Sequence, residues 1–166
     1  MAYSGRGRPF HSLGVTKIMS TTLRVAMVSP NQVEVGRKLG IDLTARTVRV
    51  ASAMIGEYLM LNFWGATERT SPSTRQCELA EEFGYDIKNM SRGVGSAIID
   101  DIMDHLNTET IEREFLEPGV TVRFRGRNDE KVRVISSISP DGTVFFKGGN
   151  GQKAWARSLE RVKSDA

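Results

Sequence analysis

The chain contains an internal repeat, and this repeat constrains its fold more than any other feature. Residues 29–59 align with residues 73–103 at an offset of 44 without a gap. Nine of the 31 pairs are identical, where about two would be expected by chance. The identical residues of the first copy are Ser29, Gln32, Glu34, Gly40, Asp42, Val50, Ser52, Ala53 and Ile55. A tandem duplication of one short unit explains this pattern.

Each copy predicts two helices joined by an extended loop. Ser29 and Ser73 are suitable N-caps, and a glutamine three residues later completes a capping box. The first helix should end at Gly40 or Gly84, because glycine readily adopts a positive φ. A threonine or serine seven residues after that glycine should cap a second helix with one apolar stripe. The stripe residues are Val50, Met54, Ile55 and Tyr58 in the first copy, and Val94, Ile98, Ile99 and Ile102 in the second.

Each copy carries a glutamine, then Gly-x-Asp, then Ser-Ala-x-Ile. This pattern resembles the helix–extended-loop–helix repeats of the SAP and LEM type, which are appended to phage and bacterial DNA-processing proteins. The chain departs from that family at Val50 and Val94, where the family often has glutamate. SAP-like units usually contact DNA backbone and LEM-like units usually contact protein. The resemblance therefore implies a binding module and leaves its ligand open.

The hydrophobic period changes to two after Pro118, which predicts a different kind of domain. Strands are expected at Val120–Arg125, Lys131–Ile135, Thr143–Lys147 and Lys153–Trp155, with a closing strand from Leu159. Four or five short strands in so few residues predict a small, strongly bent β-barrel. The opening "EPGVTVRFRG" and the closing "WARSLERV" resemble KOW and Tudor-like barrels, which bind RNA, DNA, modified tails or other proteins.

The predicted fold is α+β, with three parts. Residues 1–28 are a basic arm that ends in a short strand over 22–28. Residues 29–117 hold the two copies (29–67 and 68–117), and 107–118 within this region should form an acidic helical connector. Residues 118–166 form the barrel, which we expect to fold without the repeats.

Charge is distributed unevenly along these parts. Residues 1–28 carry four bases and no acid, residues 29–117 carry nine bases and fifteen acids, and residues 118–166 carry ten bases and five acids. Contacts with a polyanion are therefore expected from the ends, and contacts with a protein partner from the acidic second copy. The single cysteine, Cys77, and the lack of a membrane span or signal peptide favour a cytoplasmic or nucleoid-associated location.

Alternation predicts a basic face on the barrel. Val120, Val122 and Phe124 should point inward, as should Val132 and Val134 on the next strand. Arg123, Arg125, Lys131 and Arg133 would then share the outer face. Two interpretations stay open: an ordinary solvated face, or a patch that contacts phosphates. The full set of predicted nucleic-acid-binding residues is Arg6, Arg8, Arg37, Lys38, Arg46, Arg49, Arg123, Arg125, Arg127, Lys131, Arg133, Lys147 and Lys153.

Two smaller features allow two interpretations each, and a third allows one. The sequence around Arg6 and Arg8, Gly-Arg-Gly-Arg-Pro, resembles the core of an AT-hook, which binds the minor groove, but it also suits a generic basic tail. Trp155 could stack on a base or a methylated side chain, although packing in the barrel core is the favoured expectation. Phe63 and Trp64 are expected to cover the junction between the copies.

A cluster of acids on the last predicted helix raises the question of a metal site. Asp100, Asp101, Asp104 and His105 lie at helical spacing, but they occupy the positions left when the apolar residues are buried, and a solvated helix face is expected instead. No arrangement of nucleophile, base and oxyanion donors can be assembled, so no enzyme, metal or cofactor is predicted.

These features predict a non-catalytic nucleic-acid-binding accessory protein of a nucleoprotein complex. In this interpretation the arm and barrel contact phosphates of DNA or RNA, and the second copy contacts a protein. The alternative is a protein–protein adaptor or inhibitor that binds no nucleic acid. Neither interpretation involves a membrane or a small-molecule substrate.

Overall fold

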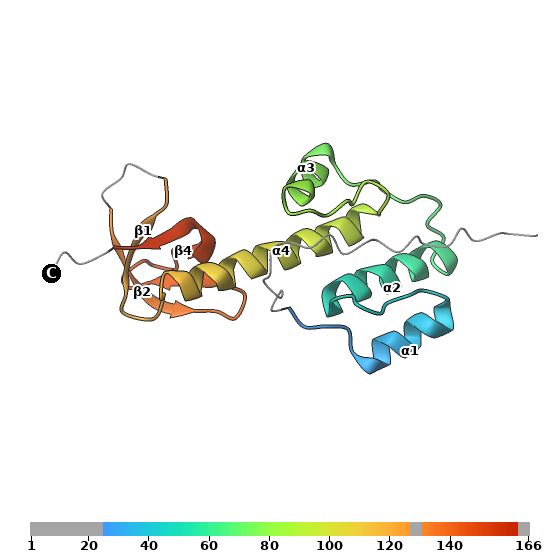
Figure 1. Ribbon diagram of the computed structural model, residues 1–166, viewed down its shortest axis with the longest axis horizontal. Helices are drawn as coiled ribbons and strands as arrows, with labels where there is room; N and C mark the ends of the chain where they lie inside the picture. The colour runs from blue at the N-terminus through green and yellow to red at the C-terminus, as the bar shows by residue number, and fades with distance from the viewer. Residues whose placement is uncertain (1–24, 127–130, 163–166) are drawn as a thin grey trace, which may run out of the picture.

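The described residues form four helices followed by a five-stranded antiparallel sheet (Figure 1). The computed structural model describes residues 25–126 and 131–162. This layout confirms the predicted α+β class. The helices are α1 (Pro30–Leu39), α2 (Val48–Asn62), α3 (Thr74–Glu82) and α4 (Arg92–Arg113). The strands are β1 (Thr121–Phe124), β2 (Arg133–Ile138), β3 (Thr143–Phe146), β4 (Lys153–Trp155) and β5 (Leu159–Arg161), with a 3-10 turn at Ala156–Ser158 before β5.

Local signals in the sequence account for the helix ends. The Ser29 hydroxyl accepts a hydrogen bond from the Gln32 backbone N–H, and the Gln32 side chain accepts one from the Ser29 N–H. The same capping box begins α3 at Ser73. Gly40 and Gly84 have φ angles of 73° and 79°, which confirms the predicted left-handed positions. These contacts satisfy backbone groups that helix termini otherwise leave without partners.

The strand expected over residues 22–28 is not found in its described part. Residues 25–28 make one isolated bridge, between Met27 and Thr47, and the N–H of Val28 donates to the carbonyl of Arg46. The segment therefore runs beside the loop that precedes α2. Residues 1–24, which hold most of the predicted arm, lie outside the described residues.

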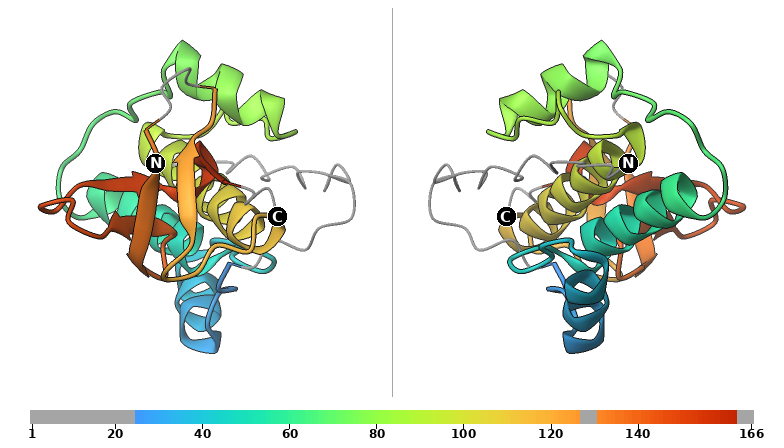
Figure 2. Two further views of the ribbon diagram at one scale, coloured as in Figure 1. Left: turned by 90° about the vertical axis from the view of Figure 1, so that its left-hand side faces the viewer. Right: turned by 90° about the vertical axis from the view of Figure 1, so that its right-hand side faces the viewer.

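One hydrophobic core joins the two helix pairs. It contains Val50 from α2 together with Ala80, Ile87, Val94, Ala97, Ile98 and Ile102 from the second pair. Figures 1 and 2 show α1 and α3 on opposite sides of the central helices α2 and α4. Among the described residues, no helix is both long and apolar enough to cross a membrane.

Helix α4 is continuous over 22 residues and extends from the helical core to the sheet. The acidic connector expected over 107–118 is therefore largely the last part of α4. After the helix ends, Phe115 takes a positive φ of 50° and Leu116 enters the sheet core at 5 % exposure. In Figure 1 the C-terminal half of α4 lies against the strands. Part of the sheet core thus comes from residues before the change of period at Pro118.

A buried asparagine fixes α4 to the sheet. Asn107 is fully buried, and its Nδ2 donates to the carbonyl of Asp141 at 2.9 Å. Its Oδ1 accepts from the backbone N–H and from Nη1 of Arg157, each at 3.2 Å. Gly142 packs so closely here that an added Cβ would lie 2.3 Å from the Cβ of Asn107. Hydrogen bonds and a close backbone approach therefore hold the helix and the sheet together.

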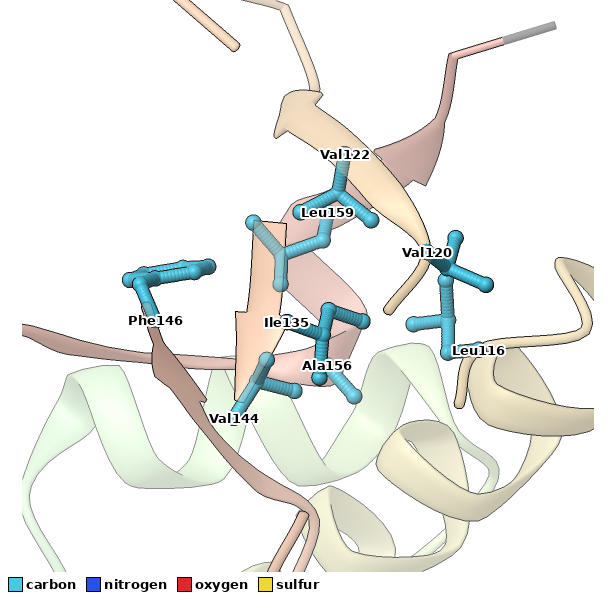
Figure 3. Close-up of a cluster of buried hydrophobic side chains, with 8 residues drawn as sticks. All are labelled: Leu116, Val120, Val122, Ile135, Val144, Phe146, Ala156 and Leu159. Carbon is cyan, nitrogen blue, oxygen red and sulfur yellow. The ribbon is translucent and has the colours of Figure 1, made fainter. Parts of the chain in front are cut away.

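The sheet has the strand order β4-β3-β2-β1-β5 and is open, with β4 and β5 at its edges. Adjacent pairs are antiparallel, and β1 pairs with both β2 and β5. A tight turn around Pro140–Gly142 connects β2 to β3, and the N–H of Gly142 donates to the carbonyl of Ser139. Figure 3 shows the core side chains on the inner face: Leu116, Val120, Val122, Ile135, Val144, Phe146, Ala156 and Leu159.

Candidate nucleic-acid interface

Two of the predicted phosphate-binding cations, Arg123 on β1 and Arg125 directly after it, are exposed, but both make ion pairs. Arg123 pairs with Glu160 on β5, directly across the strand pair. Arg125 Nη2 lies 3.0 Å from Glu114 Oε1, just beyond α4. Surface ion pairs of this kind contribute little to stability, yet they reduce the charge available to a phosphate. The β1 cations are therefore weaker candidates than the sequence indicates.

The predicted orientation of β2 is wrong. Val132 is 52 % exposed, whereas Arg133 is half-buried and pairs with the fully buried Val122. Directly paired residues of an antiparallel sheet share a face, so Arg133 lies on the inner face. Its guanidinium stacks over Phe124 and Phe146, at 5.9 and 5.2 Å from the ring centroids.

Arg133 thus closes the rim of the core rather than joining an outer basic patch. Its Nη1 donates to Gln152, while its Nε is buried and has no hydrogen-bond partner in the described part of the chain. A β-bulge between Ile135 and Ser137 then changes the alternation along β2. Of the four cations expected on one face, Lys131 alone is exposed without an ion pair to a described residue.

Basic and aromatic side chains instead share the outer face of the β3–β4 hairpin. Val144 and Phe146 point into the core, so Phe145 and Lys147 point outward. The register pairs Phe145 with Lys153 and Thr143 with Trp155, which places both β4 residues on the same outer face. Lys147 and Lys153 are exposed, and neither makes an ion pair with a described residue. We refer to Phe145, Lys147, Lys153 and Trp155 as the hairpin face.

Trp155 is 43 % exposed, so the expectation that it packs in the core is wrong. The guanidinium of Arg157 stacks on the indole at 5.0 Å from the ring centroid. Arg157 is itself held by Asn107, as described above. Burial lowers the pKa of Arg157, and the nearby charge of Asp104 partly offsets this effect. The indole is therefore positioned by a cation that is anchored to α4.

The predicted cations of the first helix pair are mostly engaged. Arg37 and Lys38 both pair with Glu34 on the same helix, and the Arg37 contact lowers the pKa of Glu34. Arg46 is half-buried, and its buried Nε has no described partner. Arg49 reaches across to α4, where it meets two carboxylates. None of these four presents an unpaired, fully exposed charge.

Asp101 does not lie on a solvated helix face, so the expectation for the acidic cluster is wrong at this residue. This residue is 5 % exposed and accepts hydrogen bonds from the Thr47 hydroxyl and from Arg49 Nη1, the latter at 2.8 Å. Arg49 Nη2 bonds Asp104 at 2.8 Å, while Asp100 is exposed. Burial raises the pKa of Asp101, against the opposing effects of Thr47 and Arg49. The cluster therefore joins α2 to α4.

No group of three or more His, Cys, Asp or Glu side chains suited to a metal ion occurs within residues 25–126 and 131–162. His105 is half-buried on α4, and Cys77 on α3 is a half-buried free thiol.

Phe63 and Trp64 do not cover a junction, contrary to expectation. They are 68 % and 66 % exposed at the end of α2, where Tyr58 contacts Phe63 at 6.4 Å between ring centroids. In Figure 1 this end of α2 points away from the sheet. Arg6, Arg8 and Arg127 lie outside the described residues.

Sequence reasoning missed three contributors to the hairpin face: Phe145, Arg157 and the supporting Asn107. The alternation in Phe145-Phe-Lys147 and Lys153-Ala-Trp155 could have revealed the shared face, because residues two apart on a strand point the same way. The position of Arg157 depends on a turn and a distant helix, which no local pattern indicates.

Comparison with known proteins gives no match: no family model, no curated protein and no solved structure matches this chain.

Proposed function

We propose that this protein is a non-catalytic nucleic-acid-binding accessory component of a nucleoprotein complex. The observation that carries the proposal is the charge of the sheet. Residues 119–126 and 131–162 hold eight lysines and arginines and two acids, a net charge of +6. Lys131, Lys147 and Lys153 are exposed, and no ion pair to a described residue neutralises them. Such a surface attracts phosphates by releasing their counterions.

We also propose that the two helix pairs are copies of one SAP- or LEM-like unit. Equivalent side-chain contacts support this proposal. Gln32 donates to Ser52 at 3.0 Å, and Gln76 donates to Ser96 at 2.9 Å, each 44 residues from its counterpart. These contacts join the start of the first helix to the second helix in both pairs.

The sheet is proposed to be a KOW- or Tudor-like module. The pairing of β1 with both β2 and β5 supports this assignment, as does the 3-10 turn that carries the chain from one edge strand, β4, to the other, β5.

A second candidate function is that of a protein–protein adaptor or inhibitor. The exposed Phe63 and Trp64 favour it, because large exposed aromatic side chains are common at protein interfaces. Residues 68–117 carry five bases and twelve acids, which suits a basic protein partner. This contact with a protein is also part of the first proposal, so nucleic-acid affinity is what separates the two functions.

Salt dependence tests the proposal. We expect the protein to bind DNA or RNA oligonucleotides at low salt, with log K falling by about 0.7 to 0.9 per phosphate contact for each unit of log salt. Changing Lys131, Lys147 and Lys153 to glutamate should abolish this binding. The control is Lys88→Glu, on the helical half, where Lys88 already faces Glu81 at 3.5 Å. If the wild-type protein has no measurable affinity for DNA or RNA, the adaptor function replaces this proposal.

A further inference from the structure

The hairpin face has a composition that distinguishes two kinds of nucleic acid. Trp155 and Phe145 present ring surface, with Lys153 on β4 and Lys147 directly after β3 on the same face. Residues two apart on a strand are separated by roughly 7 Å, so each lysine is close to an aromatic side chain. Binding to the phosphates of a duplex requires only the cations, whereas the exposed indole adds a surface on which a base can stack.

We propose that the hairpin face binds single-stranded nucleic acid, with a base stacked on the indole of Trp155. This inference rests on the proposed function and specifies its ligand. In a duplex the flat faces of the bases are covered by their neighbours, so an indole can stack only on a base that is unpaired. Lys153 is the next outward residue of β4, and Lys147 lies beyond Phe145, so both lysines lie on one side of the indole along the hairpin. There they bind phosphates of the strand that continues from the stacked base.

The support beneath Trp155 prepares it for stacking. Arg157 covers part of the ring at 5.0 Å and is bonded through Nη1 to the fully buried Asn107. This contact restricts the indole before a ligand arrives, which lowers the entropy lost on binding. Trp155 as a whole residue is 43 % exposed, which leaves room for a base.

The charge of the site argues against a cationic ligand such as a methylated side chain. Trp155 already contacts one guanidinium, and Lys153 lies two residues away on the same face. A second cation would be repelled by both groups, whereas a phosphate chain is attracted.

The test uses the full-length protein with a fluorescein-labelled 20-nucleotide oligo(dT), an oligo(rU) of the same length and a 20-base-pair duplex. We expect tighter binding to a single strand than to the duplex. Trp155→Ala should weaken single-strand binding by roughly 5- to 150-fold, the range expected for one lost base stack. Trp155→Phe should retain most of the affinity. The matched control is Trp64→Ala, an exposed tryptophan at the far end of α2, which should bind as the wild type does.

Intrinsic fluorescence gives a readout that loss of folding cannot imitate. The protein has two tryptophans, so Trp64→Phe leaves Trp155 as the only one. Unlabelled oligo(dT) should quench its emission, with a midpoint equal to the dissociation constant. Equal affinity for duplex and single strand without quenching would overturn the stacking inference and leave the proposed function in place. Absence of binding to all three oligonucleotides would overturn both.

Discussion

Replacing Arg49 by methionine tests the polar contact between the two helix pairs. The change keeps the aliphatic chain but removes the donor that reaches Asp101 Oδ1 at 2.8 Å. Asp101 would keep the Thr47 hydroxyl as its donor while remaining buried. Breaking a fully buried ion pair from one side costs roughly 3–5 kcal/mol. Because the Arg49 side chain is 42 % exposed, solvent reduces this effect, and we expect a loss of about 2 kcal/mol.

The pH dependence of this loss follows from the raised pKa of Asp101. A carboxyl whose pKa is higher in the folded than in the unfolded state favours folding most at low pH, and this contribution is lost as pH rises through the folded pKa. Removing Arg49 takes away a charge that lowers this pKa. The variant should therefore be most destabilised at neutral pH and recover part of the difference as Asp101 is protonated.

Urea unfolding and thermal unfolding, each followed by far-ultraviolet circular dichroism at pH 7 and pH 5, measure both effects. At pH 7 the melting temperature should fall by about 4–8 °C. The control is Arg37→Met, which breaks a pair of exposed side chains and should leave the melting temperature nearly unchanged. A stable Arg49→Met variant, or an equal loss at both pH values, would refute the assignment of Asp101 as a buried, ion-paired carboxylate.

Two further predictions concern the junction of α4 and the sheet. Gly142→Ala should destabilise the protein by several kcal/mol in thermal unfolding, because the added Cβ would lie 2.3 Å from the Cβ of Asn107. The control is Gly148→Ala, which has open space around it and should cost about 1 kcal/mol through its positive φ alone. Because Asn107 and Leu116 contribute to the junction and the sheet core, we no longer expect the sheet to fold alone, as the sequence indicated. A fragment of residues 104–166 should give a dispersed amide NMR spectrum, and residues 119–166, which lack Asn107 and the last turns of α4, should give a poorly dispersed one. If Gly148→Ala destabilised the protein more than Gly142→Ala, or if residues 119–166 gave the better dispersed spectrum, the junction would contribute little to stability.

The helix ends could be predicted because their causes are local. A serine, a glutamine three residues later and a glycine at the end specify a capped helix with few alternatives, and Ser29, Ser73, Gly40 and Gly84 behave accordingly. The inward side of β1 could also be predicted, because apolar and polar side chains alternate without interruption there, and Val120 and Val122 are both buried.

The misassigned residues are those whose position depends on distant partners. Alternation cannot predict that Arg133 points inward, because the pairing with Val122 and the bulge that follows set the orientation of β2. Asp101 is buried because Arg49, 52 residues earlier in the chain, neutralises it. One signal was present: in the alignment of the two copies, at an offset of 44, Asp101 matches Glu57, another acid with a poorly exposed side chain, which pairs with Arg69.

Because α4 is one continuous helix, it fixes the distance between the helical core and the sheet. At about 1.5 Å per residue its 22 residues extend roughly 33 Å. A flexible linker lets two bound ligands sample many separations, whereas one rigid helix fixes both their distance and their relative rotation. Simultaneous binding by the two ends would therefore gain avidity only with assemblies whose two sites match this span and orientation, and mismatched assemblies would be held by one end alone.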